Sequence, residues 1–198
     1  FDYLVTLATE ESIGYKSSYE RRYKHMFPLF SLQKVIEGVD SPPDWGTDDF
    51  IVTPKLDGAA VSLLYGGGEF QKALTRGDGL EGLDITHNMR HIVPETIDYE
   101  GVLQISGEVV APIQFPNARN YASGCLNLKD IEEFKTRSVD LTFVAYNAQP
   151  YMADTYGDNL KMLALMGFAT IFTVDKYYYP TDGTVWRLDN NDEFDKLG

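Results

Sequence analysis

The chain predicts an α+β fold, built from antiparallel β-sheets with flanking helices. Apolar, β-branched runs of strand length alternate with glycine-rich turns over residues 50–74. Segments with helical periodicity follow, and the longest of them, 156–166, stops at Gly167. Hydrophobic residues make up 43% and aromatic residues 13% of the 198 residues, so the chain can bury the core of one domain.

The predicted elements begin with a helical stretch at 17–23 and an apolar segment at 25–35, which Pro28 interrupts. Residues 50–74 are predicted as an antiparallel meander of three strands, and the glycine triplet 66–68 forms its second turn. That triplet lacks the Lys-Ser/Thr pair and the helix of a phosphate loop. The remaining predictions are a glycine-rich loop at 75–82, helices at 84–91, 130–135 and 156–166, an irregular segment of small residues at 117–128, and strands at 102–112, 141–146, 169–175 and 183–188.

The composition excludes some function classes. Acidic residues outnumber basic ones by 30 to 17, which gives a net charge of −13, so tight autonomous DNA binding is not expected, although a local basic groove stays open. No apolar run approaches the roughly 20 residues of a membrane span, and no signal-peptide pattern opens the chain. Cys125 is the single cysteine, which excludes an internal disulfide and fits a reducing compartment.

Lys55-Leu56-Asp57-Gly58 follows an apolar strand and delivers a lysine to the strand end. Gly58 lets the backbone turn tightly and leaves room for a nucleotide. A lysine amine, which normally titrates at about 10.4, becomes a nucleophile when desolvation or a nearby cation frees it of its proton. A surface lysine before an Asp-Gly turn would give the same tetrapeptide, so these residues alone leave both interpretations open.

Three further residues with polar groups stand out in the predicted strands and glycine turns. Arg76 lies in the glycine-dense segment 75–79 and suits bidentate contacts to phosphate or hydroxyl oxygens. Glu108 lies inside an apolar strand, where a carboxylate needs a partner such as a ribose hydroxyl. Tyr146 ends an apolar strand and could offer its ring face to a base. A loop cation, half of an ion pair and a core ring are the respective structural alternatives.

Together these segments resemble the adenylation (nucleotidyltransferase) domain of NAD-dependent DNA ligases. The Arg76 loop and the segment 117–124 distinguish the resemblance from ATP-dependent relatives. It implies an ATP-grasp-like nucleotidyltransferase fold. The stretches that carry it, in the family's order from about residue 25 to 190, are His25 with 28–32, 55–58, 75–92, 107–109, 117–124, 143–146 and 182–185.

The resemblance implies a reaction. Lys55 would attack the α-phosphate of NAD, release nicotinamide mononucleotide (NMN) and carry AMP, which would pass to the 5′-phosphate at a DNA nick. Magnesium would offset the phosphate charge. The implied partners are nicked DNA, bound through domains missing from this chain, and further domains or a partner chain that recognise NMN. The implied location is the cytoplasm of a bacterium or of a virus-infected cell.

The resemblance also assigns roles to residues. Asp57 would orient Lys55 or assist metal or proton handling, and Arg119 would face the phosphate or the nick. Glu108 and Arg76 would hold the ribose. The implied catalytic residues are Lys55, Asp57 and Arg187, and the implied nucleotide-binding residues are Ser31, Leu32, Thr53, Arg76, Glu108, Tyr146 and Val185, of which Tyr146 and Val185 would sandwich adenine. No residue is expected to ligate a metal, since the three histidines lack ligand spacing.

The chain departs from the family pattern at four positions. Thr53 replaces a glutamate, Ser106 and Asn127 each replace an arginine, and Arg187 replaces a lysine. Residues 1–24 are expected to be an N-terminal extension, which could be the remnant of an NMN-recognition module, and 25–198 the adenylation domain without its closing lysine motif. The chain would then be a fragment or one subunit of a split, viral-type ligase. A degenerate nucleotide-binding module and an ATP- or GTP-dependent nucleotidyltransferase, of RNA-ligase or capping type, stay open as alternatives.

Overall fold

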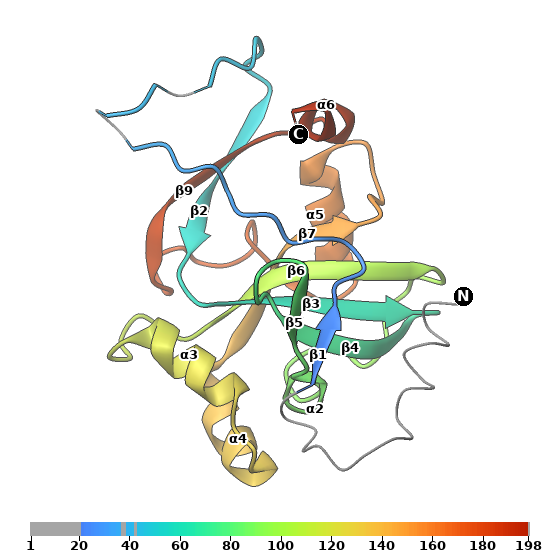
Figure 1. The fold of residues 1–198 in the computed structure, drawn as a ribbon, viewed down its shortest axis with the longest axis vertical. Helices are drawn as coiled ribbons and strands as arrows, with labels where there is room; N and C mark the ends of the chain where they lie inside the picture. Colours follow the sequence, from blue (N-terminus) through green and yellow to red (C-terminus); the bar gives the residue numbers. More distant parts are fainter. Residues whose placement is uncertain (1–20, 37–38, 42, 198) are drawn as a thin grey trace.

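A five-stranded sheet lies at the centre of the molecule (Figure 1). The computed structural model describes residues 21–36, 39–41 and 43–197. In sheet order the strands are β4 (Glu69–Thr75), β3 (Ala59–Gly66), β6 (Val102–Val110), β7 (Thr142–Gln149) and β8 (Ala169–Thr170). All neighbouring strands are antiparallel except β7 and β8, which are parallel. The mixed architecture with mainly antiparallel sheets confirms the predicted class.

The two faces of this sheet differ because strand side chains alternate between them. In β3, Leu63 and Tyr65 are fully buried on one face and belong to the hydrophobic core. Ser62 points to the other face, where β6 contributes Ser106 directly opposite it and Gln104 two residues away. We call this second side, which carries Ser62, Gln104 and Ser106, the polar face.

Helices cover parts of the core. Helix α5 (Tyr156–Leu165) packs against β7 through Leu160 and Leu163, and α4 (Ile131–Arg137) buries Phe134. The side chain of Asp130 accepts the first backbone N–H groups of α4, which fixes where that helix begins. Both helices were predicted, whereas α2 (Thr86–Met89) is shorter than the predicted helix at 84–91. No helix in the described part of the chain is long and apolar enough to cross a membrane.

A second, two-stranded sheet pairs β2 (Phe50–Leu56) with β9 (Thr181–Leu188). The predicted meander over 50–74 is therefore wrong at its first strand, although β3 and β4 form the predicted hairpin. After β2, Asp57 N–H still donates to the carbonyl of Pro180, just before β9. Gly58 then passes so close to the Val109 carbonyl that an added side chain would clash. The prediction of a strand at 183–188 is confirmed.

Two other predictions are wrong. The segment 117–128 is not irregular, because Ala118–Leu126 forms helix α3 and buries Ala122 and Cys125 against the core. The predicted strand at 169–175 pairs only as far as β8, beyond which the chain turns. A short acidic helix, α6 (Asn191–Lys196), and a 3₁₀ turn, η3 (Ser138–Asp140), were not predicted.

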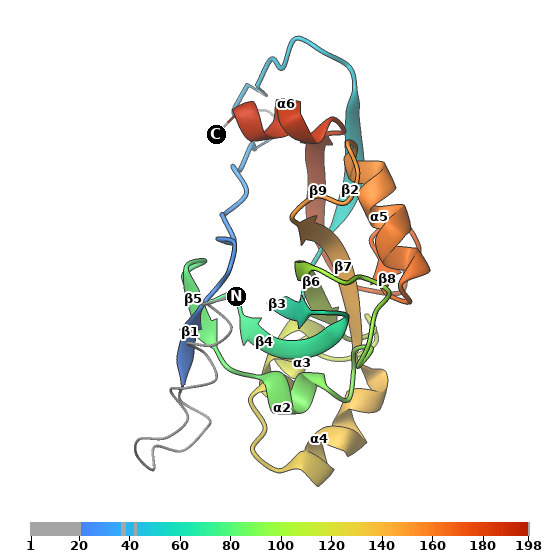
Figure 2. The same cartoon turned by 90° about the vertical axis from the view of Figure 1, so that its right-hand side faces the viewer.

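The first described residues form β1 (Arg22–Lys24), which pairs with β5 (Glu81–Leu83). The predicted helix at 17–23 is thus wrong for residues 22 and 23, and its residues 17–20 lie outside the described part. Residues 25–31, which we call the strap, continue from β1 along the side of the molecule that lies opposite α5 (Figure 2). The strap crosses the polar face, and this position decides much of the site's geometry.

Candidate active site

Lys55 lies near the end of β2, beside the turn that leads into the central sheet. Its Nζ atom donates to both carboxylate oxygens of Asp182, at 2.8 and 3.0 Å. The two side chains are 43% and 44% exposed, so the amine is within reach of a molecule that arrives from solvent. Asp182 comes from the start of β9, which shows that the pairing of β2 with β9 creates this contact.

The turn after Lys55 is tied to β6 and to helix α3. Gly58 N–H donates to the Glu108 carboxylate at 3.1 Å. Asp57 forms an ion pair with Arg119 of α3, at 3.4 Å between nitrogen and oxygen. These contacts bring four of the predicted site residues, Lys55, Asp57, Glu108 and Arg119, around one turn.

Glu108 is a half-buried carboxyl group whose pKa is higher than that of a free glutamate. Desolvation, helped by the nearby Asp57 carboxylate, raises its pKa to a net value of about 7. The Gly58 N–H, Arg119 and Lys55 act in the opposite direction. Near neutral pH this group therefore exists in both protonation states, and a hydrogen-bonding ligand could select either of them.

An arginine loop lies between β4 and β5. Arg76 donates from Nη2 to the Ser31 hydroxyl at 2.6 Å, which brings together two predicted nucleotide-binding residues. The loop keeps its shape because Gly77 and Gly79 adopt positive φ angles and Asp78 accepts the N–H groups of Leu80 and Glu81. These backbone hydrogen bonds lower the pKa of Asp78.

Tyr146 lies at a bulge of β7, between residues that pair with Ser106 and Gly107. Burial raises the pKa of Tyr146, and the Glu108 carboxylate raises it too, whereas Arg76 lowers it. The ring therefore lies within electrostatic range of two other site residues. Next to it, the Oδ1 atom of Asn147 is buried and accepts no hydrogen bond from the described residues. The bulge thus presents an aromatic ring and an unused acceptor beside the site.

The remaining predicted residues occupy different surroundings. Thr53 is buried directly opposite Val185 across the β2–β9 pair, and Leu32 is exposed. Arg187 is opposite Ile51, four residues or about 13 Å of strand from Lys55. Its guanidinium donates to the Leu188 carbonyl and to Asn191 and stacks on the rings of Tyr156 and Phe194, so these contacts lie at the end of β9, in α5 and in α6.

Sequence patterns missed two of these contacts. Asp182 was noted within a matching stretch but was given no role, because only the pairing of β2 with β9 brings it to Lys55. His25 was predicted only as part of a stretch that resembles the family's nucleotide-contacting segment, and its hydrogen bond to the arginine loop was not predicted. An open hollow of about 350 Å³ adjoins the turn on the α3 side, and its lining includes Asp57, Asn117 and Arg119.

Comparisons with known proteins give a consistent answer. The sequence profile of the NAD-dependent DNA ligase adenylation domain matches residues 18–178, which include Lys55, Arg76, Glu108 and Tyr146. A DNA ligase of Sulfurovum sp. is 28% identical over an alignment of 224 positions, which covers 92% of this chain and 34% of the relative. DNA ligases of Pelagibacter ubique and of Helicobacter pylori strain G27 are each 34% identical, over 77% and 62% of this chain. The chain spans between about a fifth and a third of the length of these relatives.

Proposed function

This chain belongs to the family of NAD-dependent DNA ligase adenylation domains, and on that premise we propose that Lys55 takes AMP from NAD as a covalent adduct. The observation that carries the proposal is the accessible amine of Lys55, held by the Asp182 carboxylate and flanked by Asp57 and Glu108. A lysine that only supports the turn would not need an acidic partner from a distant strand together with two further carboxyl groups beside the same turn.

The proposed step is an in-line displacement at phosphorus. Lys55 Nζ forms a bond with the adenylyl phosphorus of NAD, the bond from that phosphorus to the bridging oxygen breaks, and NMN leaves with the electron pair. The amine can attack only after it loses a proton. Asp182 already accepts hydrogen bonds from this ammonium group, which supports it as the group that takes the proton.

The nucleotide is proposed to lie where Arg76, Ser31, Glu108 and Tyr146 converge. The Arg76 guanidinium has donors left beyond the one used by Ser31, and these suit ribose or phosphate oxygens. Glu108 would accept a ribose hydroxyl in its ionised state. Tyr146 would stack on adenine, with Val185 and Thr53 on the opposite sheet. Arg119, released from Asp57, would contact a phosphate.

Magnesium is proposed as the ion that offsets phosphate charge when bound. The described residues contain no group of three or more His, Cys, Asp or Glu side chains that could hold a metal. Magnesium in nucleotide sites commonly takes one or two carboxylates together with phosphate oxygens, and Asp57 beside Lys55 fits that donor set.

The sealing of DNA nicks is proposed for the whole ligase, of which this chain would supply the adenylation step. The relatives are named DNA ligases and are about three to five times longer than the matched region. Nick binding and NMN recognition would come from further domains or from a partner chain, in the cytoplasm of a bacterium or of a virus-infected cell.

Intact mass spectrometry tests the proposal. The protein is incubated with magnesium and NAD, ATP or GTP, with and without an added NMN-recognition module. We expect an AMP adduct from NAD that is absent in Lys55→Ala and retained in Lys24→Ala. Reversible AMP binding without any adduct would favour a degenerate nucleotide-binding module, and a GMP adduct would favour capping chemistry.

A further inference from the structure

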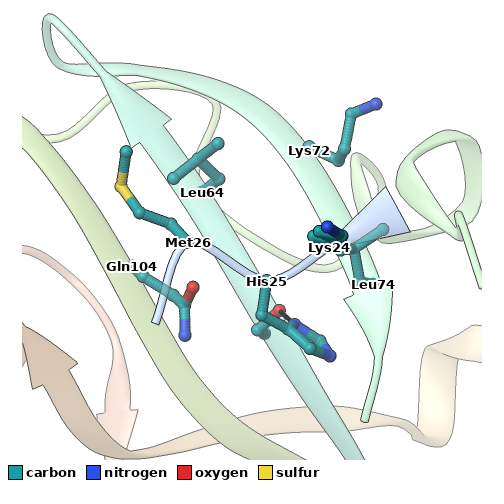
Figure 3. A pocket seen from close by; sticks show the side chains of 8 residues that line it. Lys24, His25, Met26, Leu64, Lys72, Leu74 and Gln104 are labelled. Atoms are coloured by element: carbon teal, nitrogen blue, oxygen red, sulfur yellow. Dashed lines mark hydrogen bonds between the residues drawn. The ribbon is translucent and has the colours of Figure 1, made fainter. Parts of the chain in front are cut away.

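The strap is attached to the polar face largely by side chains of the sheet. His25 is only 7% exposed, and Figure 3 shows it between Gln104 on one side and Leu74 on the other. Its Nδ1 atom lies 2.8 Å from the Ser62 hydroxyl, and its Nε2 atom lies 3.0 Å from the backbone carbonyl of Arg76. One imidazole therefore connects the strap, strand β3 and the arginine loop.

The partners of His25 define which tautomer its neutral ring adopts. A carbonyl oxygen only accepts, so Nε2 carries the hydrogen that is donated to Arg76. A neutral ring then has its lone pair on Nδ1, which accepts from the Ser62 hydroxyl. Burial lowers the pKa of His25 despite the opposing effects of the Arg76 carbonyl and Asp78, which favours this neutral form.

The strap and the arginine loop are connected at both ends. At the far end of the strap, Ser31 accepts a hydrogen bond from the Arg76 side chain at 2.6 Å. Between the two ends, Leu29 N–H donates to the Gly79 carbonyl, and the Gln104 amide bonds both the N–H and the carbonyl of Phe27. His25 thus holds the backbone of the residue whose side chain holds Ser31.

The space beneath the strap is too small for a substrate. The pocket that includes His25, Ser62 and Gln104 has a volume of about 10 Å³, which leaves room for about one water molecule (Figure 3). Its lining also contains Lys24 and Lys72. The polar groups of His25 are therefore used for attachment, and any effect of this residue on a ligand has to act through Arg76 and Ser31.

We propose that His25 is a positioning residue for nucleotide binding, because its bond to the Arg76 carbonyl sets the loop and the strap so that Arg76 and Ser31 face the nucleotide together. The inference rests on the proposed function and adds to it a residue that touches neither the nucleotide nor Lys55. His25 would strengthen nucleotide binding through preorganisation, because a loop that is already held in place loses less conformational freedom when a ligand binds.

Two substitutions separate the two ring nitrogens. The amide nitrogen of His25→Gln can reach the position of Nε2 and donate to Arg76, whereas that of His25→Asn reaches only the position of Nδ1. AMP affinity of the full chain is measured by calorimetry, after melting curves establish that each variant folds. We expect Gln to bind AMP within about twofold of wild type and Asn to bind it about three- to tenfold more weakly. The matched control is His91→Asn, at an exposed histidine that follows helix α2.

A double-mutant cycle tests whether the effect passes through Arg76. Arg76→Ala should weaken AMP binding, and His25→Asn should cause no further loss in that background. Where His25→Asn does not fold, Ser62→Ala replaces it, and the same dependence on Arg76 is expected. Equal losses of AMP affinity in His25→Gln and His25→Asn, or an undiminished loss in the Arg76→Ala background, would overturn this inference but not the proposed function. If wild type did not bind AMP, the proposed function would fail with it.

Discussion

At the scale of single residues, the proposed chemistry depends on the proton carried by Lys55. Asp182→Asn keeps an oxygen that can accept from the amine but removes the carboxylate that could take its proton. We expect the rate of AMP transfer to Lys55 to fall by about 100-fold or more, with AMP affinity changed less than threefold. The rate is followed by intact mass over time, in a single turnover with NAD, magnesium and an NMN-recognition module.

Asp98→Asn is the matched control, since Asp98 is an exposed acidic residue in the loop before β6. Its transfer rate should equal that of wild type. A normal rate in Asp182→Asn would mean that solvent or another group removes the proton, and Asp182 would then be left with an orienting role.

Glu108 should make stability depend on pH in the direction opposite to that of a salt-bridged carboxylate. Its pKa is about 7 in the folded protein against 4.5 for the reference group, so the folded state binds more protons between these values. Stability therefore falls as pH rises from about 4.5 to 7 and changes little beyond. In Glu108→Gln this loss, of about 1–3 kcal/mol, should be absent. Urea unfolding at pH 5 and pH 8 measures the difference, and equal pH slopes in both proteins would contradict it.

Individual residues also show which of the predicted site residues the fold brings together. Lys55, Asp57, Glu108 and Arg119 meet at one turn, as their common assignment to a site predicts. Arg187 does not reach Lys55, because its partners come from α5 and α6, and the pattern of β9 contains no information on these helices. Asp182 was not assigned a role for a similar reason, since the contact joins residues 127 positions apart.

At the scale of elements, the strap and the arginine loop fit together only because Gly79 has no side chain. Its φ angle is +90°, and an added Cβ would collide with the Leu29 carbonyl. Gly79→Ala should therefore lower the free energy of unfolding by about 1–2 kcal/mol and weaken AMP binding. Hydrogen exchange should show faster exposure of the Leu29 N–H, which donates to Gly79 in wild type.

Gly124→Ala is the control for that prediction. Gly124 lies inside α3 with open space around it, so alanine should raise the free energy of unfolding by about 0.5–1 kcal/mol. Chemical denaturation measures both variants. Unchanged stability and AMP affinity in Gly79→Ala would mean that the strap shifts without consequence for the site.

The element predictions failed where long-range pairing outweighs local order. Strand β2 was assigned to a meander because consecutive strands usually pair, yet it leaves the central sheet and pairs with β9. Helix α3 was missed because its asparagine, serine and glycine residues are weak helix formers, and burial of Cys125 and Leu126 stabilises it instead. Elements defined by apolar periodicity and clear caps, such as α5, were predicted correctly.

At the scale of the whole molecule, charge separates nucleotide binding from DNA binding. The chain carries 30 acidic and 17 basic residues, and DNA affinity at physiological salt depends on the number of phosphates that basic side chains neutralise. A nucleotide needs only the few cationic groups near Lys55, whereas a duplex would also face the acidic surface. In these relatives, about two thirds or more of the length lies outside the matched region and could supply DNA contacts.

We therefore expect AMP, but not nicked duplex DNA, to raise the melting temperature of this chain. In fluorescence anisotropy at about 150 mM salt, a labelled nicked duplex should show no saturable binding at micromolar protein, because net repulsion opposes the contribution of isolated cations such as Arg119. The full-length Sulfurovum ligase provides the positive control on the same duplex. Saturable binding below about 1 μM would reveal a basic surface that outweighs the net charge of −13, and Arg119→Ala would then locate it at α3 if the affinity fell.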